Sequence, residues 1–238
     1  TTAPSHYDWD YLGIGDGATA TLNWTIIRYG GDYWDGAGML INHGDLTLTN
    51  STLSHSNSNG LYHQGTALSV NACTFANNNN DGVELHTFDN VTAPSIVDSV
   101  FLDNGFYGIS IDYDASASVQ TGSITGNTGS GNQNNGIEVD GSIGGAVQWE
   151  TNIDFPYIVD TLSVSSGGSL TIDPGVVVKF DTYDTSYLTI WGTLTADADA
   201  ANPTIFTSLH DDSYGGDTDG ATTAPSHYDW DYLGIGDG

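Results

Sequence analysis

The stretch Leu48–His63 reads LTNSTLSHSNSNGLYH, and its pattern returns as VNACTFANNNNDGVEL and as IVDSVFLDNGFYGISI, starting at Val70 and Ile96. In each stretch two apolar residues enclose four others, and seven residues after the second one a glycine opens a strand-like triplet. Two features at a constant offset indicate one repeated unit. The three starts define a period of roughly 22 to 26 residues, and such a period of strand and turn residues is typical of one coil of a parallel β-helix.

The repeat predicts columns of side chains, because residues at equivalent places in successive coils stack above one another. One interior column is expected to hold Leu48, Val70, Ile96 and Val119. A second interior column is expected to hold Ile27, Leu53, Phe75, Phe101 and Ile124. The triplets are expected to place on the outer surface Leu40, Tyr62, Glu84, Ser110 and Glu138.

Between the paired apolar residues the chain has to turn a corner. Asn50 and Asp98 occupy the same place in this frame. Both residue types tolerate the left-handed conformation that such a corner needs. The asparagine-rich loop Asn77–Asp81 has two interpretations, a ligand-binding loop or a ladder of side-chain hydrogen bonds between coils, and we favour the ladder.

The first seventeen residues, TTAPSHYDWDYLGIGDG, return letter for letter at Thr222–Gly238. Chance does not produce a match of this length. We therefore interpret the chain as one full unit of a tandem array, which ends just before Thr222, with the opening of the next unit, within a longer protein. Residues 1–238 are expected to form a single solenoid, with 1–17 and 222–238 as copies of one segment in successive units. Two arrangements satisfy this pattern. The units are joined in one continuous chain, or separate chains assemble into a filament.

The composition favours strands and turns over helices. Glycine is abundant at 31 residues, and β-branched residues alternate with threonine, serine and asparagine. The sequence thus predicts an all-β fold, a right-handed parallel β-helix (solenoid). Dividing the length of the unit by a coil of roughly 23 residues gives about nine to ten coils.

Three segments carry a family resemblance: SLTIDPGVVVKF (Ser169–Phe180), LTIWGTLTADADAANPTIFTS (Leu188–Ser208) and DDSYGGDTDG (Asp211–Gly220). They resemble the repeated segments of tandem-repeat bacterial and archaeal cell-surface proteins with a right-handed parallel β-helix of the pectate-lyase-like fold. Trp230 and its copy Trp9 fit the strand that follows the acidic loop in this family. The resemblance implies an extracellular or cell-surface location. It leaves activity open, because the same fold carries both enzymes and structural proteins.

The charge of the chain is extreme, with 30 acidic and 2 basic residues and a formal net charge of −28. Such a surface repels nucleic acid, anionic membranes and polyuronates. With Arg28 and Lys179 as the only basic side chains, a polyuronate lyase that needs a cationic base is disfavoured. No apolar run is long enough for a membrane span. Tolerance of high salt, calcium binding and solubility each account for the acidity.

Candidate ligand-binding residues lie on two loops. Glycine-rich loops with spaced carboxylates suit calcium, which accepts several oxygen ligands in flexible geometry. The candidate metal ligands are Asp211, Asp212, Asp217 and Asp219, and calcium is the one cofactor that the sequence suggests. Tyr33 and Trp34 in GDYWDG are candidates for stacking on sugar rings. Glu84 and Glu138 are expected two coils apart, roughly 10 Å. Chance accounts for such a pair in so acidic a chain, so no catalytic residue is assigned.

These observations predict a non-enzymatic extracellular structural repeat of a large tandem-array surface protein, building a stalk, fibre or sheath, with adhesion as an added role. Its partners would be adjacent copies of the same unit, head to tail, and cell-surface glycans. The alternative is a carbohydrate-binding or carbohydrate-cleaving β-helix similar to glycoside hydrolases, which would use two carboxylates.

Overall fold

The computed structural model of the protein describes residues 3–31, 37–87, 93–115, 122–182 and 185–236. All regular elements in these ranges are strands, and none of the described residues forms a helix long and apolar enough to cross a membrane. The all-β fold class is therefore confirmed.

The strands form four parallel sheets. The largest contains β1 (Leu12–Ile14), β4 (Leu40–Asn42), β7 (Leu61–His63), β10 (Val83–Thr87), β13 (Tyr107–Tyr113), β16 (Asn134–Ile143), β18 (Tyr157–Val164), β20 (Val177–Phe180), β21 (Tyr187–Ile190), β23 (Ile205–Ser208) and β24 (Tyr232–Ile235). The second contains β2 (Thr19–Asn23), β5 (Asp45–Thr49), β8 (Ala67–Asn71), β11 (Ser95–Val97) and β14 (Ile124–Thr125). The third contains β3 (Ile26–Arg28), β6 (Thr52–Ser54), β9 (Thr74–Ala76), β12 (Val100–Leu102) and β15 (Thr128–Ser130). The fourth contains β17 (Ala146–Trp149), β19 (Ser169–Ile172) and β22 (Thr193–Thr195).

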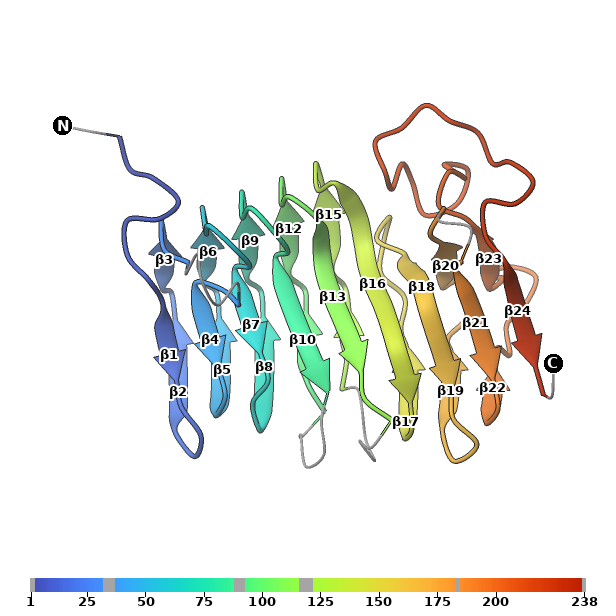
Figure 1. Cartoon of the computed structure of the whole chain (residues 1–238), viewed down its shortest axis with the longest axis horizontal. Coiled ribbons are helices and arrows are strands. Elements are labelled where there is room, and N and C mark those ends of the chain that lie inside the picture. The colour runs from blue at the N-terminus through green and yellow to red at the C-terminus, as the bar shows by residue number, and fades with distance from the viewer. Residues whose placement is uncertain (1–2, 32–36, 88–92, 116–121, 183–184, 237–238) are drawn as a thin grey trace.

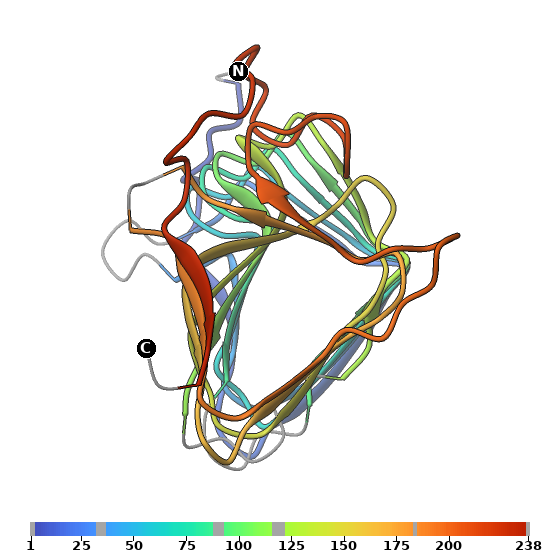
Figure 2. The same ribbon diagram turned by 90° about the vertical axis from the view of Figure 1, so that its right-hand side faces the viewer.

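Each strand pairs with its equivalents in the coils before and after it, so the chain winds as a solenoid (Figure 1). Viewed along the axis, the ribbon has a triangular outline, and the equivalent strands of successive coils lie behind one another (Figure 2). The interior is a continuous apolar core that follows the axis. Because a single coil cannot bury its own apolar side chains, the stack as a whole stabilises each member.

The predicted interior columns are confirmed over the first four coils. Leu48 pairs with Val70, and Val70 pairs with Ile96. In the second column Leu53 follows Ile27, and two phenylalanines complete the series: Phe75 and Phe101. All of these side chains are buried.

The column prediction is wrong at the fifth coil. Ile124 pairs with Ile96 and so belongs to the first column, while Val119 lies outside the described residues. Gly129 takes the place below Phe101, and the ring of Phe155 fills the space that this glycine leaves, 5.5 Å from the Phe101 ring centre. This coil contains additional residues, so the five-residue spacing of positions 119 and 124 matches the pattern without marking the corner. The corner lies between Ile124 and Gly129.

The corner predictions are confirmed. Asn50 and Asp98 adopt φ of 50° and 51°. A ladder of buried asparagines runs along a neighbouring corner: the Asn78 amide donates to Asn104 Oδ1 at 2.9 Å, and the Asn104 amide donates to Asn132 Oδ1 at 2.8 Å. The asparagine-rich segments therefore satisfy buried backbone and side-chain polar groups between coils.

Among the described residues the largest sheet passes nine strands from β1 to β24 and hence eight steps, slightly fewer than the nine to ten coils predicted. The difference has a local cause. In the last rungs the strand of the largest sheet is split in two: β18 pairs with both β20 and β21, and β23 is separated from β24 by residues 209–231. That long segment lies outside the stack (Figure 1), so it adds residues without adding a coil.

Candidate functional site

The outer face of the largest sheet carries a line of polar side chains. The register aligns Glu84 with Ser110 and Ser110 with Glu138, so the two glutamates are two rungs apart, as predicted. Leu40, expected in this column, instead points inward and is fully buried, and Ile41 pairs with Tyr62. One extra residue after Gly38 reverses the alternation, because side chains on a strand switch faces at each residue.

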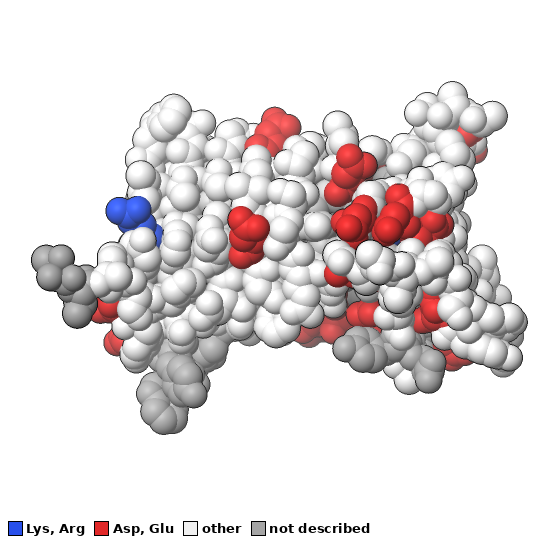
Figure 3. All heavy atoms as spheres, turned by 90° about the horizontal axis from the view of Figure 1, so that it is seen from above, with Lys and Arg blue, Asp and Glu red and all other residues white. Residues whose placement is uncertain are grey.

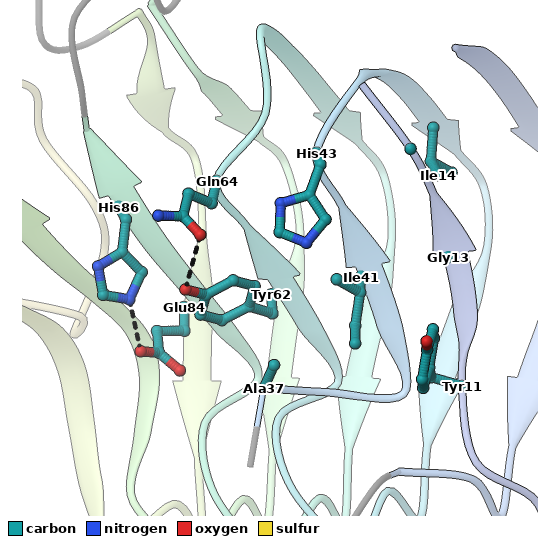
Figure 4. Close-up of a pocket in the computed structure, with 11 residues that line it drawn as sticks. Tyr11, Gly13, Ile14, Ala37, Ile41, His43, Tyr62, Gln64, Glu84 and His86 are labelled. Atoms are coloured by element: carbon teal, nitrogen blue, oxygen red, sulfur yellow. Dashed lines mark hydrogen bonds and ion pairs between the residues drawn. The ribbon is translucent and has the colours of Figure 1, made fainter. Parts of the chain in front are cut away.

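A groove of about 830 Å3 crosses the N-terminal half of this face. Its centre is Tyr62, whose ring lies 6.4 Å from the His43 ring and 5.1 Å from the His86 ring (Figure 4). The Tyr62 hydroxyl donates to Gln64 Oε1 at 3.3 Å. Glu84 and His86 line the same groove. The groove thus presents an aromatic ring among hydrogen-bonding groups.

His86 lies between two carboxylates. Its Nε2 is 2.7 Å from Glu84 Oε1, and its Nδ1 is 3.1 Å from Asp112 Oδ2. The hydrogen bond to Glu84 and the charges of both carboxylates raise the pKa of His86 above its ordinary value. Two acceptors around one imidazole favour its doubly protonated form.

Burial raises the pKa values of three carboxyl groups on this face or beside it. Burial, with the nearby Asp140 as a secondary cause, raises the pKa of Glu138 to about 8. Burial also raises the pKa of Asp81 to about 7 and the pKa of Asp140 to about 6. Ser110 Oγ donates to Glu138 Oε2 at 2.6 Å. A buried acid with a raised pKa retains its proton near neutral pH and can donate it.

This arrangement predicts a pH-dependent stability that Glu138→Gln reduces. Between the ordinary glutamate pKa of 4.5 and the folded value of about 8, the folded protein keeps a proton that the unfolded chain has released. Stability therefore falls as pH rises through this window, by up to about 1.4 kcal/mol per pH unit for one group. We expect urea unfolding at pH 5 to 8 to show a shallower decline for Glu138→Gln than for the wild type. Asp197→Asn on an exposed loop is the control, and parallel curves for Glu138→Gln and the wild type would contradict the prediction.

The acidic loop lies between β23 and β24, and carboxylates gather toward the C-terminal end of the molecule (Figure 3). One oxygen each of Asp212, Asp217 and Asp219 lie within 4.8 Å of one another. Asp211 is directed elsewhere: its Oδ2 accepts from Thr207 Oγ1 at 2.7 Å, and its Oδ1 accepts from Ser213. The structure therefore brings together three of the four predicted metal ligands.

Lys179 supplies a built-in positive charge beneath this loop. The side chain is fully buried, and its Nζ donates to the Gly216 carbonyl at 2.8 Å. Burial lowers the pKa of Lys179, and the loop aspartates oppose that shift, led by Asp212. One ammonium balances only part of the charge of the aspartates around it, so the loop retains a net negative charge.

The sugar-binding candidates Tyr33 and Trp34 lie outside the described residues. Sequence reasoning missed the groove around Tyr62 and the second outward column, which aligns His86 with Asp112 and Asp140. The sequence could have revealed this column, because residues two apart on a strand share a face. His86, Asp112 and Asp140 each follow a residue of the first outward column by two places. The prediction considered only one outward position of each triplet.

The stacked parallel coils with a groove on one outer face define a β-solenoid. Residues 10–149 match the family model described as a right handed beta helix region. The chain belongs to this right-handed β-helix family, since the match spans more than half of its residues. Neither the comparison with curated proteins nor that with solved structures found a significant match.

Proposed function

We propose that this protein is a structural repeat of a tandem-array protein at the cell surface, where successive β-helical units build a stalk, fibre or sheath. The single observation that supports it is the placement of the duplicated segment. Its first copy contains β1 and its second contains β24, and both strands belong to the largest sheet, at opposite ends of the solenoid (Figure 1). A unit that starts and finishes on the same strand of the same sheet is suited to regular repetition.

Two experiments test this proposal. Antibodies raised against the chain should label intact cells of the source organism, and electron microscopy of the full-length product should show rods. From β1 to β24 the largest sheet passes nine strands and hence eight steps, so each unit should add roughly 40 Å at about 4.8 Å per step. Labelling only after permeabilisation, or compact particles, would argue against the proposal.

The second candidate is a carbohydrate-binding or carbohydrate-cleaving β-helix, with adhesion as the related use. The groove around Tyr62 and the buried acid Glu138 favour it, because aromatic rings stack on sugars and glycoside hydrolysis uses a protonated carboxyl group. A glycan array and a hydrolysis screen separate the candidates. Binding lost in Tyr62→Ala but kept in the exposed control Tyr228→Ala, or turnover lost in Glu138→Gln, would replace the purely structural role.

Calcium is proposed as a weak ligand of the loop carboxylates of Asp212, Asp217 and Asp219. Extracellular calcium modules have dissociation constants near 10⁻⁴–10⁻³ M, and a tenfold excess of ligand over Kd stabilises a protein by about 1.4 kcal/mol. We expect about 10 mM calcium to raise Tm by a few degrees and Asp217→Asn to abolish the increase. Asp197→Asn should keep it. Equal Tm values in calcium and in chelator would rule the ligand out.

A further inference from the structure

The two copies of the duplicated segment contact opposite neighbours through different atoms. In the first copy, Leu12 N–H donates to the Met39 carbonyl at 2.9 Å, and the Ile14 carbonyl accepts from His43 N–H at 2.8 Å. These bonds face the coil that follows. In the second copy, Asp231 and Gly236 N–H donate at 2.9 Å each to the carbonyls of two residues in the coil that precedes, Ser186 and Ile190. One strand with this sequence can therefore make both sets of bonds at once.

The tryptophan of the segment also meets a different partner in each copy. Trp230 stacks on Phe180, with ring centres 4.1 Å apart. Trp9 Nε1 instead donates to the Arg28 carbonyl at 2.9 Å, and its ring covers Gly30 so closely that a Cβ there would lie 2.7 Å from it. A single tryptophan that made both sets of contacts would lie between Phe180 on one side and Gly30 on the other.

Asp8 and Asp229, the residues just before the two tryptophans, also have different partners in the two copies. In both copies its Oδ2 accepts the N–H of the serine three residues earlier, at 3.2 Å for Asp8 and 2.9 Å for Asp229. Only Asp229 has the preceding coil beside it, and there its Oδ2 also accepts from Ser208 Oγ at 2.5 Å. Asp8 N–H has the following coil beside it and donates to the Tyr29 carbonyl at 2.9 Å.

Burial shows what each copy lacks. Ile14 is 5% exposed beneath the following coil, whereas its copy Ile235 is 70% exposed. The flanks differ as well, since Tyr228 has φ of 81° while Tyr7 has no positive φ. The strand pairing itself agrees, because Leu12 pairs with Leu40 and Leu233 pairs with Leu188 at the same position of the segment.

The strands that follow the largest sheet in each coil would also be in phase across such a junction. Ile190 aligns with Ile235, the copy of Ile14, and Ile14 aligns with Asn42. β22 begins three residues after Ile190, and β5 begins three residues after Asn42. β5 in turn pairs with β2. In a junction that shared the segment, this phase would align Thr193 with Thr19 and place two half-buried side chains, Leu194 and Ala20, next to each other.

We propose that a second copy of this unit docks at each end of the solenoid by sharing one copy of the seventeen-residue segment, so that the two solenoids continue without a gap. At this junction the shared strand pairs with Leu188 of the preceding unit and Leu40 of the following unit. The shared tryptophan fills the slot between Phe180 and Gly30. The inference rests on the proposed function, and it adds the partner surface and its register.

Identical substitutions at the two tryptophans of the full chain provide the test, because they should have opposite effects. Trp9→Ala loosens the first copy from its own coil and frees that coil for the intact second copy of another molecule. We expect it to form head-to-tail oligomers at a concentration at least tenfold lower than Trp230→Ala, which lacks the donor tryptophan. The double variant should stay monomeric. Sedimentation velocity measures assembly, and circular dichroism reports folding.

Amide hydrogen exchange in a chain of two units provides a second measurement that needs no substitution. Such a chain continues from Gly238 into a second copy of Ala18 and beyond, so that one shared segment forms its junction. Protection of Leu233 N–H should rise at least tenfold over the single-unit chain, because it gains the Met39 carbonyl of the following unit. Monomeric, folded Trp9→Ala or unchanged protection of Leu233 would overturn the junction. Surface rods would still be observed if flexible linkers joined the units, so failure of the junction and failure of the proposed function are distinguishable.

Discussion

Phe101→Ala should lower the free energy of unfolding by about 3–5 kcal/mol, the usual cost of removing a buried aromatic ring. Phe101 is fully buried and lies in the middle of a stack, 5.2 Å from the Phe75 ring and 5.5 Å from the Phe155 ring. The loss is expected at the upper end because the rigid strands on both sides limit collapse around the cavity. Equilibrium urea unfolding followed by circular dichroism measures it.

Phe106→Ala is the matched control for this prediction. Phe106 lies five residues further along the same coil but is 46% exposed, so its truncation should cost well under half as much. A loss below about 1 kcal/mol for Phe101→Ala, or equal losses for both variants, would contradict the idea that the phenylalanine column stabilises the stack.

Asn104→Ala should destabilise the protein by about 2–5 kcal/mol through hydrogen bonds rather than through packing. Asn104 Oδ1 accepts from Asn78 N–H at 3.2 Å, and its amide donates to the Phe75 carbonyl at 3.1 Å. Removal of the side chain leaves buried groups of both neighbouring residues without these partners. Each unsatisfied buried group costs about 1–3 kcal/mol.

The exposed asparagine Asn79 provides the comparison for the ladder. Its amide donates to Asn57 Oδ1 at 3.3 Å on the surface, where water can replace the lost bond. Asn79→Ala is therefore expected to change the free energy of unfolding by less than about 0.5 kcal/mol. If the Asn79 and Asn104 variants unfold at the same urea concentration, the buried ladder does not stabilise the coils.

The fold was predictable because each coil repeats the same pattern of buried apolar residues and turns. Leu48, Val70 and Ile96 occur at equivalent places, and one coil explains the next. The prediction failed where residues were added, at Ile124 and at Leu40, because a shift of one place changes the face or the column of a side chain. Sequence spacing alone does not show where such a shift occurs. The pairing of each strand with its neighbour in the next coil shows it.

The candidate site was less predictable than the fold. The aspartates of the acidic loop stood out by composition, but only the structure shows that Lys179 lies beneath them and that Asp211 turns away. The groove at Tyr62 depends on residues from four strands, β1, β4, β7 and β10, and from the segments that connect them. No local pattern marks such a surface, because its members come together only when the coils stack.

The parallel pairing of every coil has a mechanical consequence. Hydrogen bonds between the strands of a sheet run across the strands, so in a solenoid they point along the axis. A pull on the two ends therefore loads these bonds lengthwise, and the sheets around one coil share the tension. The weakest coil yields first and releases the length of chain wound into it, so such a rod would lengthen under load in steps instead of breaking at once.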